Sequence, residues 1–254
     1  MLILKVVLVI LVFIIITLPL FFVIRFNLNK NITSKAINNV NEYKNVNNYL
    51  LQITEHNIDF ERNTESFHNS KYFYKDNQYK KEMHSETPGV NIQNADSFEY
   101  GNINSKEKVE IIETQKVCYN VKANYILQKK DGFLDFMMIA LQPFSEDYGT
   151  LPNIWFQAGY NLRTDKYNGR KCYVLRIGDK SSYGEIWIDK EQNTLVRTVD
   201  EIYNRSYSEK VYSIKSDVVT NEDVTLPNLT GDTIKDSEDN VPSEYIGIYE
   251  KLGI

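Results

Sequence analysis

The residues that most often carry chemistry in proteins are few in this sequence, and their spacing forms no catalytic or metal-binding motif. The three histidines, His56, His68 and His84, make neither an H-x-x-x-H pair nor a Cys/His set with zinc spacing. Asp189 and Glu191 form a carboxylate pair, but they fall in a segment that predicts a polar turn. The sequence also contains no serine-nucleophile elbow, P-loop or dinucleotide-binding fingerprint. We therefore expect a non-enzymatic protein without a cofactor or a metal site, in which the histidines are surface or packing residues.

The two cysteines, Cys118 and Cys172, both fall in predicted strands. In an oxidising compartment they are a candidate disulfide, and two buried free thiols are the alternative. A bridge requires their Cα atoms to approach within about 7 Å. The sequence leaves both possibilities open.

A second candidate site is apolar. Residues 132–142 read GFLDFMMIALQ and are followed by Pro143. This segment is too short to cross a bilayer and is apolar nearly all round, which predicts a helix buried on most sides. Ligand pockets are mostly apolar and use flexible side chains such as methionine. We therefore predict an acyl-binding cavity, with a closed and fully packed core as the alternative. Its candidate lining residues are Phe133, Leu134, Phe136, Met137, Met138, Leu141, Ile186 and Ile188, with Trp155 and Phe156 at the rim.

The elements that must position these residues are mainly strands. Apolar residues alternate with polar ones along most of the chain after residue 47, and short polar turns separate the runs. In Gly184–Asp189, this alternation puts Ile186 and Ile188 on one face and Trp187 on the other. Hairpins between neighbours in sequence favour an antiparallel meander, curved around the apolar helix or capped by it. The predicted strands are Asn48–Ile58, Lys71–Lys75, Tyr79–His84, Glu107–Asn120, Cys172–Ile177, Gly184–Asp189, Thr194–Tyr203 and Arg205–Val219.

The N-terminal segment Val6–Ile24 contains 19 residues and no charge. As a helix it would be about 28 Å long, which matches the hydrocarbon core of a bilayer. A cleaved signal peptide, an uncleaved anchor and a buried core helix are the three interpretations. We favour the uncleaved anchor, because the run is long and no small residues follow it directly. Asn31–Asn47 then predicts a separate amphipathic helix with Thr33 or Ser34 as its cap.

Composition limits the partners. The chain has 254 residues and a net charge of −5, which does not suggest nucleic-acid binding. The acidity is concentrated in Asp217–Ile254, where nine acidic and two basic residues predict a solvated tail. We expect a membrane anchor in residues 1–30, with the transmembrane helix at about residues 4–24. One domain follows in residues 31–230, and an acidic tail occupies residues 231–254.

Three patches, with a leading helix before them and a mid-chain helical piece between the first two, carry a resemblance to a known family, and only the last two patches are specific. Tyr72–Glu82 reads YFYKDNQYKKE, Tyr183–Arg197 reads YGEIWIDKEQNTLVR, and Asp223–Leu229 reads DVTLPNL. Their order resembles that of the LolA-like superfamily of lipoprotein carriers and related extracytoplasmic proteins. The resemblance covers Thr33 to Leu229. It implies a mainly β (α+β) fold, in which an antiparallel meander forms an unclosed β half-barrel with covering helices around an apolar cavity.

The same resemblance implies what such a domain does and where it works. Members bind acyl chains, or sense lipoproteins and regulate membrane-bound partners, and the family is not enzymatic. We expect a single-pass cell-membrane protein whose C-terminal domain lies outside the cytoplasm and binds a lipid, lipopeptide or lipoprotein-like ligand. Because the domain is tethered, a shuttle role is not expected. A protein-interaction or sensor module that regulates a membrane protein is the alternative. The lysines and arginine around the anchor do not favour export, so the resemblance decides the orientation.

Overall fold

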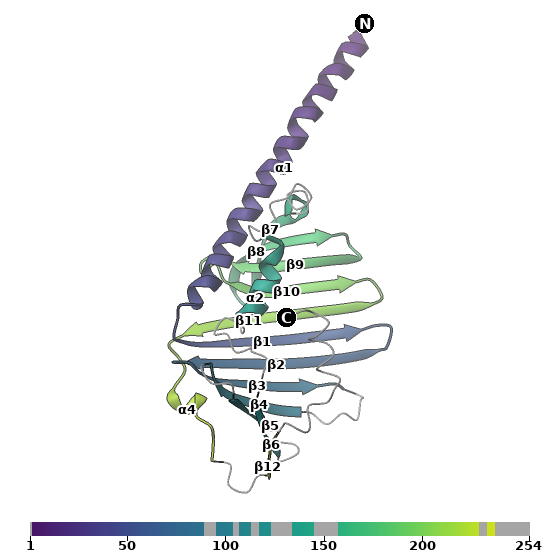
Figure 1. The fold of residues 1–254 in the computed structure, drawn as a ribbon. Helices are drawn as coiled ribbons and strands as arrows, with labels where there is room; N and C mark the ends of the chain where they lie inside the picture. The colour runs from purple at the N-terminus through teal and green to yellow at the C-terminus, as the bar shows by residue number, and fades with distance from the viewer. Residues whose placement is uncertain are drawn as a thin grey trace. The chain divides into compact units, whose positions relative to one another are not determined.

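The computed structural model describes residues 2–88, 95–103, 107–112, 117–122, 134–144, 157–228 and 233–236 (Figure 1). The described helices are α1 (Leu2–Tyr43), α2 (Asp135–Leu141), the 3-10 turn η2 (Gln142–Phe144) and α4 (Asn221–Val224). The first strands are β1 (Asn48–Asp59), β2 (Thr64–Lys75), β3 (Gln78–Glu86), β4 (Ala95–Asn102), β5 (Glu107–Ile112) and β6 (Val117–Lys122). They are followed by β7 (Asn161–Tyr167), β8 (Arg170–Gly178), β9 (Ser182–Asp189), β10 (Leu195–Ile202), β11 (Ser206–Ser216) and β12 (Thr233–Asp236).

Helix α1 is one uninterrupted helix of 42 residues, about 63 Å long at 1.5 Å per residue. From Ile10 it is apolar enough to be a candidate membrane span, and its apolar window is 0% buried, which excludes the buried core helix. The predicted break at Thr33 or Ser34 is wrong. Thr33 Oγ1 donates back to the carbonyl oxygen of Asn29 at 2.8 Å, so this side chain bonds within the helix and caps nothing.

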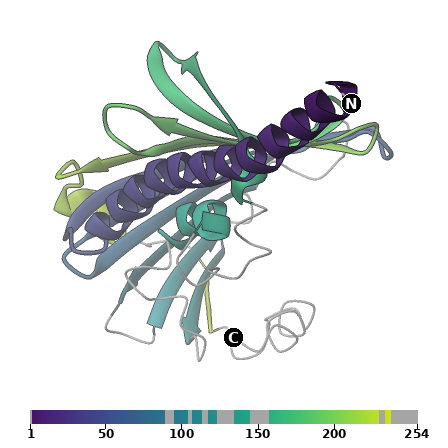
Figure 2. The ribbon, with the colours of Figure 1, turned by 90° about the horizontal axis from the view of Figure 1, so that it is seen from above.

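The chain forms two compact units, and the first contains residues 1–42 and 136–211. Its strands have the order β11-β10-β9-β8-β7, with every neighbouring pair antiparallel. One face of these strands carries Leu175, Ile186, Ile188 and Leu195, all buried. Helix α2 lies in front of the strands in Figure 1, and Figure 2 also places it on one side of them. Unit 1 therefore contains both the candidate span and the apolar helix.

The second unit contains residues 43–135 and 212–254. Its strand order is β12-β6-β5-β4-β3-β2-β1, with the C-terminal part of β11 next to β1. A row of buried tyrosines crosses three strands, because Tyr49 pairs with Tyr74 and Tyr74 pairs with Tyr79. The row ends on Gly101 of β4, which lies directly opposite Tyr79. Such a row of aromatic residues on one face fixes the register of the strands.

Asparagine and aspartate shape the hairpin turns. Asn63, Asn193 and Asn204 have φ values of 50°, 52° and 55°, the left-handed region that asparagine tolerates better than most residues. The carboxylate of Asp59 accepts the backbone N–H groups of Glu61 and Arg62, each at 3.0 Å, at the start of the β1–β2 turn. These local conformations and hydrogen bonds determine where the chain turns, and they involve no distant residues.

The fold class predicted from the sequence is confirmed. In the described part, the chain is mainly β, with an unclosed antiparallel sheet, a few helices and one apolar N-terminal helix. Two details differ. Glu107–Asn120 is not one strand, because β5 and β6 pair antiparallel with each other. The segment predicted as an acidic tail also contributes a strand, β12, which pairs parallel with β6.

Gly101→Ala tests the tyrosine row. A Cβ at residue 101 would lie 2.5 Å from the hydroxyl oxygen of Tyr79, which is buried and donates to Glu99 Oε1 at 2.8 Å. Because the tyrosine ring cannot easily move away, we expect the substitution to lower the free energy of unfolding by about 1–3 kcal/mol. Equilibrium urea unfolding of the full chain in mild detergent measures the change.

Gly159→Ala is the matched control, because among the described atoms its new Cβ would meet Ile177 Cδ1 at an ordinary 3.8 Å. Its effect should stay within about 0.5 kcal/mol. Equal effects of the two substitutions would contradict the proposed packing of Tyr79 on Gly101.

Candidate functional site

The candidate apolar site is built on one face of the unit 1 strands. Leu175 of β8 lies opposite Ile186 of β9, and Ile188 of β9 lies opposite Leu195 of β10. Gly159 lies next to Ile177, so residues 157–159 approach the same face. This face is therefore a continuous apolar surface under covering segments, as the alternation in Gly184–Asp189 predicted.

Helix α2 has two apolar sides. Leu134, just before the helix, and Met137 and Leu141 within it are fully buried. On the opposite side, Phe136 is 45% exposed and Ile139 is 64% exposed. The prediction that this helix is buried on most sides is therefore wrong. A surface helix normally presents polar residues to water, so an exposed phenylalanine and isoleucine three residues apart need an explanation.

The other predicted site residues divide into two groups. Met138 is half-buried, and Ile186 and Ile188 are buried on the sheet face. Phe133, Trp155 and Phe156 lie outside the described residues. Cys172 is buried on β8, and the side chain of Cys118 on β6 is outside the described part, so the disulfide stays a prediction. The cavity itself also stays a prediction.

Sequence reasoning missed the joint between α1 and the rest of unit 1. Asn29 is 1% exposed, and its Nδ2 donates to the carbonyl oxygens of Gln157 at 2.9 Å and of Tyr160 at 3.0 Å. One turn earlier, Arg25 donates to the carbonyl oxygen of Tyr160 and to Oδ1 of Asn161, both at 2.7 Å. Buried carbonyl groups require such donors, so this joint fixes the angle at which α1 enters the domain.

Tyr160 connects the joint to α2. Its ring packs against Phe144 of η2, with 4.9 Å between the ring centroids, and both rings are buried. Burial, with a smaller effect from the Asp200 carboxylate, raises the pKa of Tyr160 to about 12. The hydroxyl is therefore neutral at physiological pH. Because η2 directly follows α2, the C-terminal end of α2 lies close to the joint.

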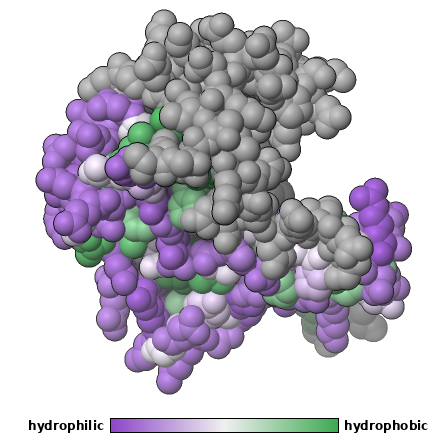
Figure 3. Space-filling model, turned by 90° about the horizontal axis from the view of Figure 1, so that it is seen from below, coloured by the Kyte–Doolittle hydropathy of each residue, from purple (hydrophilic) through white to green (hydrophobic). Residues whose placement is uncertain are grey.

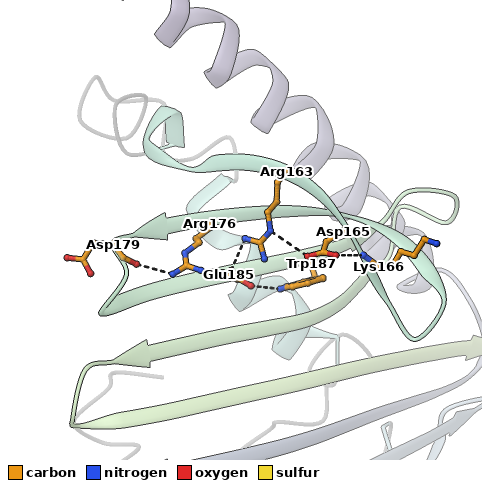
Figure 4. Close-up of polar contacts among 7 residues, drawn as sticks. All are labelled: Arg163, Asp165, Lys166, Arg176, Asp179, Glu185 and Trp187. Atoms are coloured by element: carbon orange, nitrogen blue, oxygen red, sulfur yellow. Dashed lines mark hydrogen bonds and ion pairs between the residues drawn. The ribbon is translucent and has the colours of Figure 1, made fainter.

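The opposite face of the unit 1 strands carries a cluster of charged and aromatic residues (Figure 4). Glu185 is only 6% exposed and accepts from Arg163 at 2.9 Å, from Arg176 at 3.2 Å and from the indole N–H of Trp187 at 2.9 Å. The Arg163 guanidinium lies 5.5 Å from the ring centroid of Trp187. Both oxygens of the Glu185 carboxylate thus accept hydrogen bonds, which is typical of a structural network.

The cluster extends to β10 and β11 with balanced charge. Arg197 lies 5.0 Å from the Trp187 ring centroid and pairs with Glu209 at 2.6 Å. Each arginine described on this face therefore has an acidic partner, so the cluster is not an anion-binding patch. The paired arginine and glutamate side chains themselves cover Trp187 and the buried Cys172 and Val174 beside it.

The remaining candidates for chemistry have local partners. The Asp189 carboxylate accepts the backbone N–H groups of Glu191 and Gln192, so it shapes a turn, as its position predicted. His56 lies 2.7 Å from Glu65, and His84 lies 2.8 Å from Glu86. His68 lies 2.9 Å from the Ser85 hydroxyl. Among the described residues, no group of three or more His, Cys, Asp or Glu side chains could hold a metal ion.

No protein-family model matches this chain, and no curated protein sequence matches it. Among solved structures, it is similar to the Pseudomonas aeruginosa MucA/MucB complex, with 9% identity, a TM-score of 0.37, and coverage of 78% of this chain and 61% of that one. In a second structure, MucB in complex with MucA(peri), this chain spans 60% of the matched chain.

Two further solved structures are matched over nearly their whole length. The Mycobacterium tuberculosis lipoprotein LppX has 11% identity and a TM-score of 0.38, with coverage of 78% of this chain and 99% of that one. A LolA superfamily protein from Nitrosomonas europaea has 8% identity and a TM-score of 0.27, with coverage of 75% and 97%.

Asn29→Ala tests the joint. The substitution removes two buried hydrogen bonds, each worth about 0.5–1.5 kcal/mol, while the carbonyl oxygen of Gln157 keeps the backbone N–H of Tyr160 at 3.3 Å. For a chain of this length we expect the Tm to fall by about 2–4 °C per kcal/mol. Thermal unfolding of the full chain measures it. Asn27→Ala, on the exposed side of the same helix, is the control and should leave the Tm nearly unchanged. If both variants melt like the wild type, the joint does not stabilise the domain.

Proposed function

We propose that this protein is a membrane-anchored, non-enzymatic binding protein whose apolar site at α2 takes up an acyl chain of a lipid, lipopeptide or lipoprotein-like ligand. The observation that carries the proposal is the two-sided apolar character of α2. Met137 and Leu141 hold the helix in place, while Phe136 and Ile139 remain exposed. An acyl chain along that side would remove both side chains from water, which is favourable in proportion to the area covered.

The anchor supports the proposal independently. The side chains between Ile10 and Ile24 are mostly exposed and are apolar, so they need a hydrocarbon environment. We place the domain outside the cytoplasm, as the sequence resemblance implies. The space-filling view from below also shows patches of apolar surface between hydrophilic side chains (Figure 3). Exposed apolar patches of this kind are typical of proteins that contact lipids or partners.

A protein-interaction or sensor module is the second candidate. Strand β12 supports it, because it holds the acidic C-terminal segment against β6 and so gives the tail a fixed origin. In this reading Phe136 and Ile139 contact a helix of a membrane protein, since residues three apart on a short helix form one contact surface.

The proposal predicts that Phe136 and Ile139 together determine acyl-chain binding. We expect the double variant Phe136→Ser/Ile139→Ser to lose labelling by a photo-crosslinkable long-chain fatty acid by at least about tenfold. Covering each large apolar side chain contributes about 1.5–3 kcal/mol, and 1.4 kcal/mol is a factor of ten. The assay uses the full chain in liposomes, with crosslinked peptides identified by mass spectrometry.

Ile202→Ser is the control, because Ile202 is another exposed isoleucine of unit 1, 48% exposed at the end of β10 against 64% for Ile139. It should label like the wild type. Wild-type protein that takes up no probe, but whose exposed α2 residues crosslink to a co-expressed membrane protein, would replace the acyl-chain proposal with the second candidate.

A further inference from the structure

The candidate span and the domain are joined without a linker. Arg25 directly follows the apolar run, and its guanidinium lies 5.3 Å from the ring centroid of Phe21 within that run. The same guanidinium donates to the carbonyl oxygen of Tyr160 and to Oδ1 of Asn161. One side chain thus touches both the end of the span and the first residue of β7.

The helix then stays attached to unit 1 for several turns. Asn29 is held by the carbonyl groups of Gln157 and Tyr160, and the next buried residues of α1 continue the contact as far as Val40. Near that end, Asn39 Nδ2 donates to the carbonyl oxygen of Gln192 at 3.3 Å. A helix held at both ends of its docked part cannot swing, so unit 1 is fixed at a short distance from the membrane surface.

The acyl-binding side of α2 lies at this membrane-proximal end. Tyr160 accepts from Arg25 through its carbonyl oxygen and packs against Phe144 through its ring. Ile139 precedes Phe144 by five residues, which is about 8 Å along a helix. Among the described residues, Tyr160 and Phe144 therefore connect the end of the span to the C-terminal end of α2.

Basic residues on the same part of α1 suit a headgroup region. The ammonium group of Lys30 lies 6.0 Å from the ring centroid of Phe26, which is one helical turn earlier in α1. Lys35 is exposed further along the same helix. Lysines at the end of a span extend their ammonium groups toward lipid phosphates while their stems stay on apolar surface.

We infer that the acyl ligand reaches α2 directly from the bilayer, from the leaflet next to unit 1 in which the apolar run of α1 ends. The ligand is then a membrane-embedded lipid or lipoprotein and not a fatty acid taken up from water. This inference rests on the proposed function. A long acyl chain leaves a bilayer for water very slowly, whereas a site fixed beside the bilayer receives the chain without crossing water. The rigid joint supplies this position.

The test inserts ten Gly/Ser residues between Ile24 and Arg25 of the full chain, which keeps the hydrogen bonds of Arg25 and Asn29 to residues 157–161 but frees the span. Two photo-crosslinkable probes are compared in proteoliposomes: a phospholipid embedded in the bilayer, and a fatty acid delivered from water on cyclodextrin. We expect the insertion to reduce labelling of α2 by the phospholipid at least fivefold and to leave labelling by the fatty acid within twofold. The same insertion before Leu2 is the control and should change neither.

The outcomes separate this inference from the proposed function. Unchanged phospholipid labelling in the insertion variant overturns the bilayer route but leaves acyl binding intact. Fatty-acid labelling without any phospholipid labelling of the wild type also overturns it. If neither probe labels α2 in the wild type, the proposed function fails and the inference fails with it. Retained fatty-acid labelling in the variant also shows that it has folded.

Discussion

The position of α1 on unit 1 depends on one buried amide group, the side chain of Asn29. Asn29 Nδ2 donates to two backbone carbonyl oxygens that lie 128 and 131 residues further along the chain. A buried carbonyl without a donor is destabilising, so these bonds hold the helix and the segment 157–160 in one arrangement. Arg25 adds a charge-assisted bond to the carbonyl oxygen of Tyr160. Because α1 does not end between the candidate span and Asn29, this joint connects the candidate span rigidly to the rest of unit 1.

Successive side chains along the unit 1 strands point to opposite faces of the sheet, and the two faces differ in what they bury. One face is apolar and is covered by other segments, and α2 adds its buried side to that core. The other face buries Trp187 under arginine side chains whose charges Glu185 and Glu209 neutralise. In the described part of this face, the charged side chains are paired with one another.

Much of the fold could be predicted from the sequence, because local patterns determine it. Alternation identified most strands of both units, and the turn segment at Asp189 behaves as its composition indicates. The errors come from distant interactions. Thr33 looks like a helix cap, but Asn29 and Arg25 find partners beyond residue 156 that keep α1 continuous. The pairing of β12 with β6 joins segments more than 100 residues apart, and no local pattern specifies it. The exposure of Phe136 and Ile139 likewise depends on which side of α2 packs, which a helix that is apolar all round does not reveal.

A distance measurement in a bilayer tests most directly whether α1 is connected rigidly to the rest of unit 1. Spin labels carried by non-natural amino acids at Ile16, in the exposed apolar part of α1, and at Lys171, on the exposed surface of β8, leave both native cysteines in place. Double electron–electron resonance spectroscopy then reports the distribution of distances between the two labels. A single narrow distribution is expected if one helix carries both the anchor and the joint. A broad distribution would show that the domain swings freely on its anchor and would contradict the account.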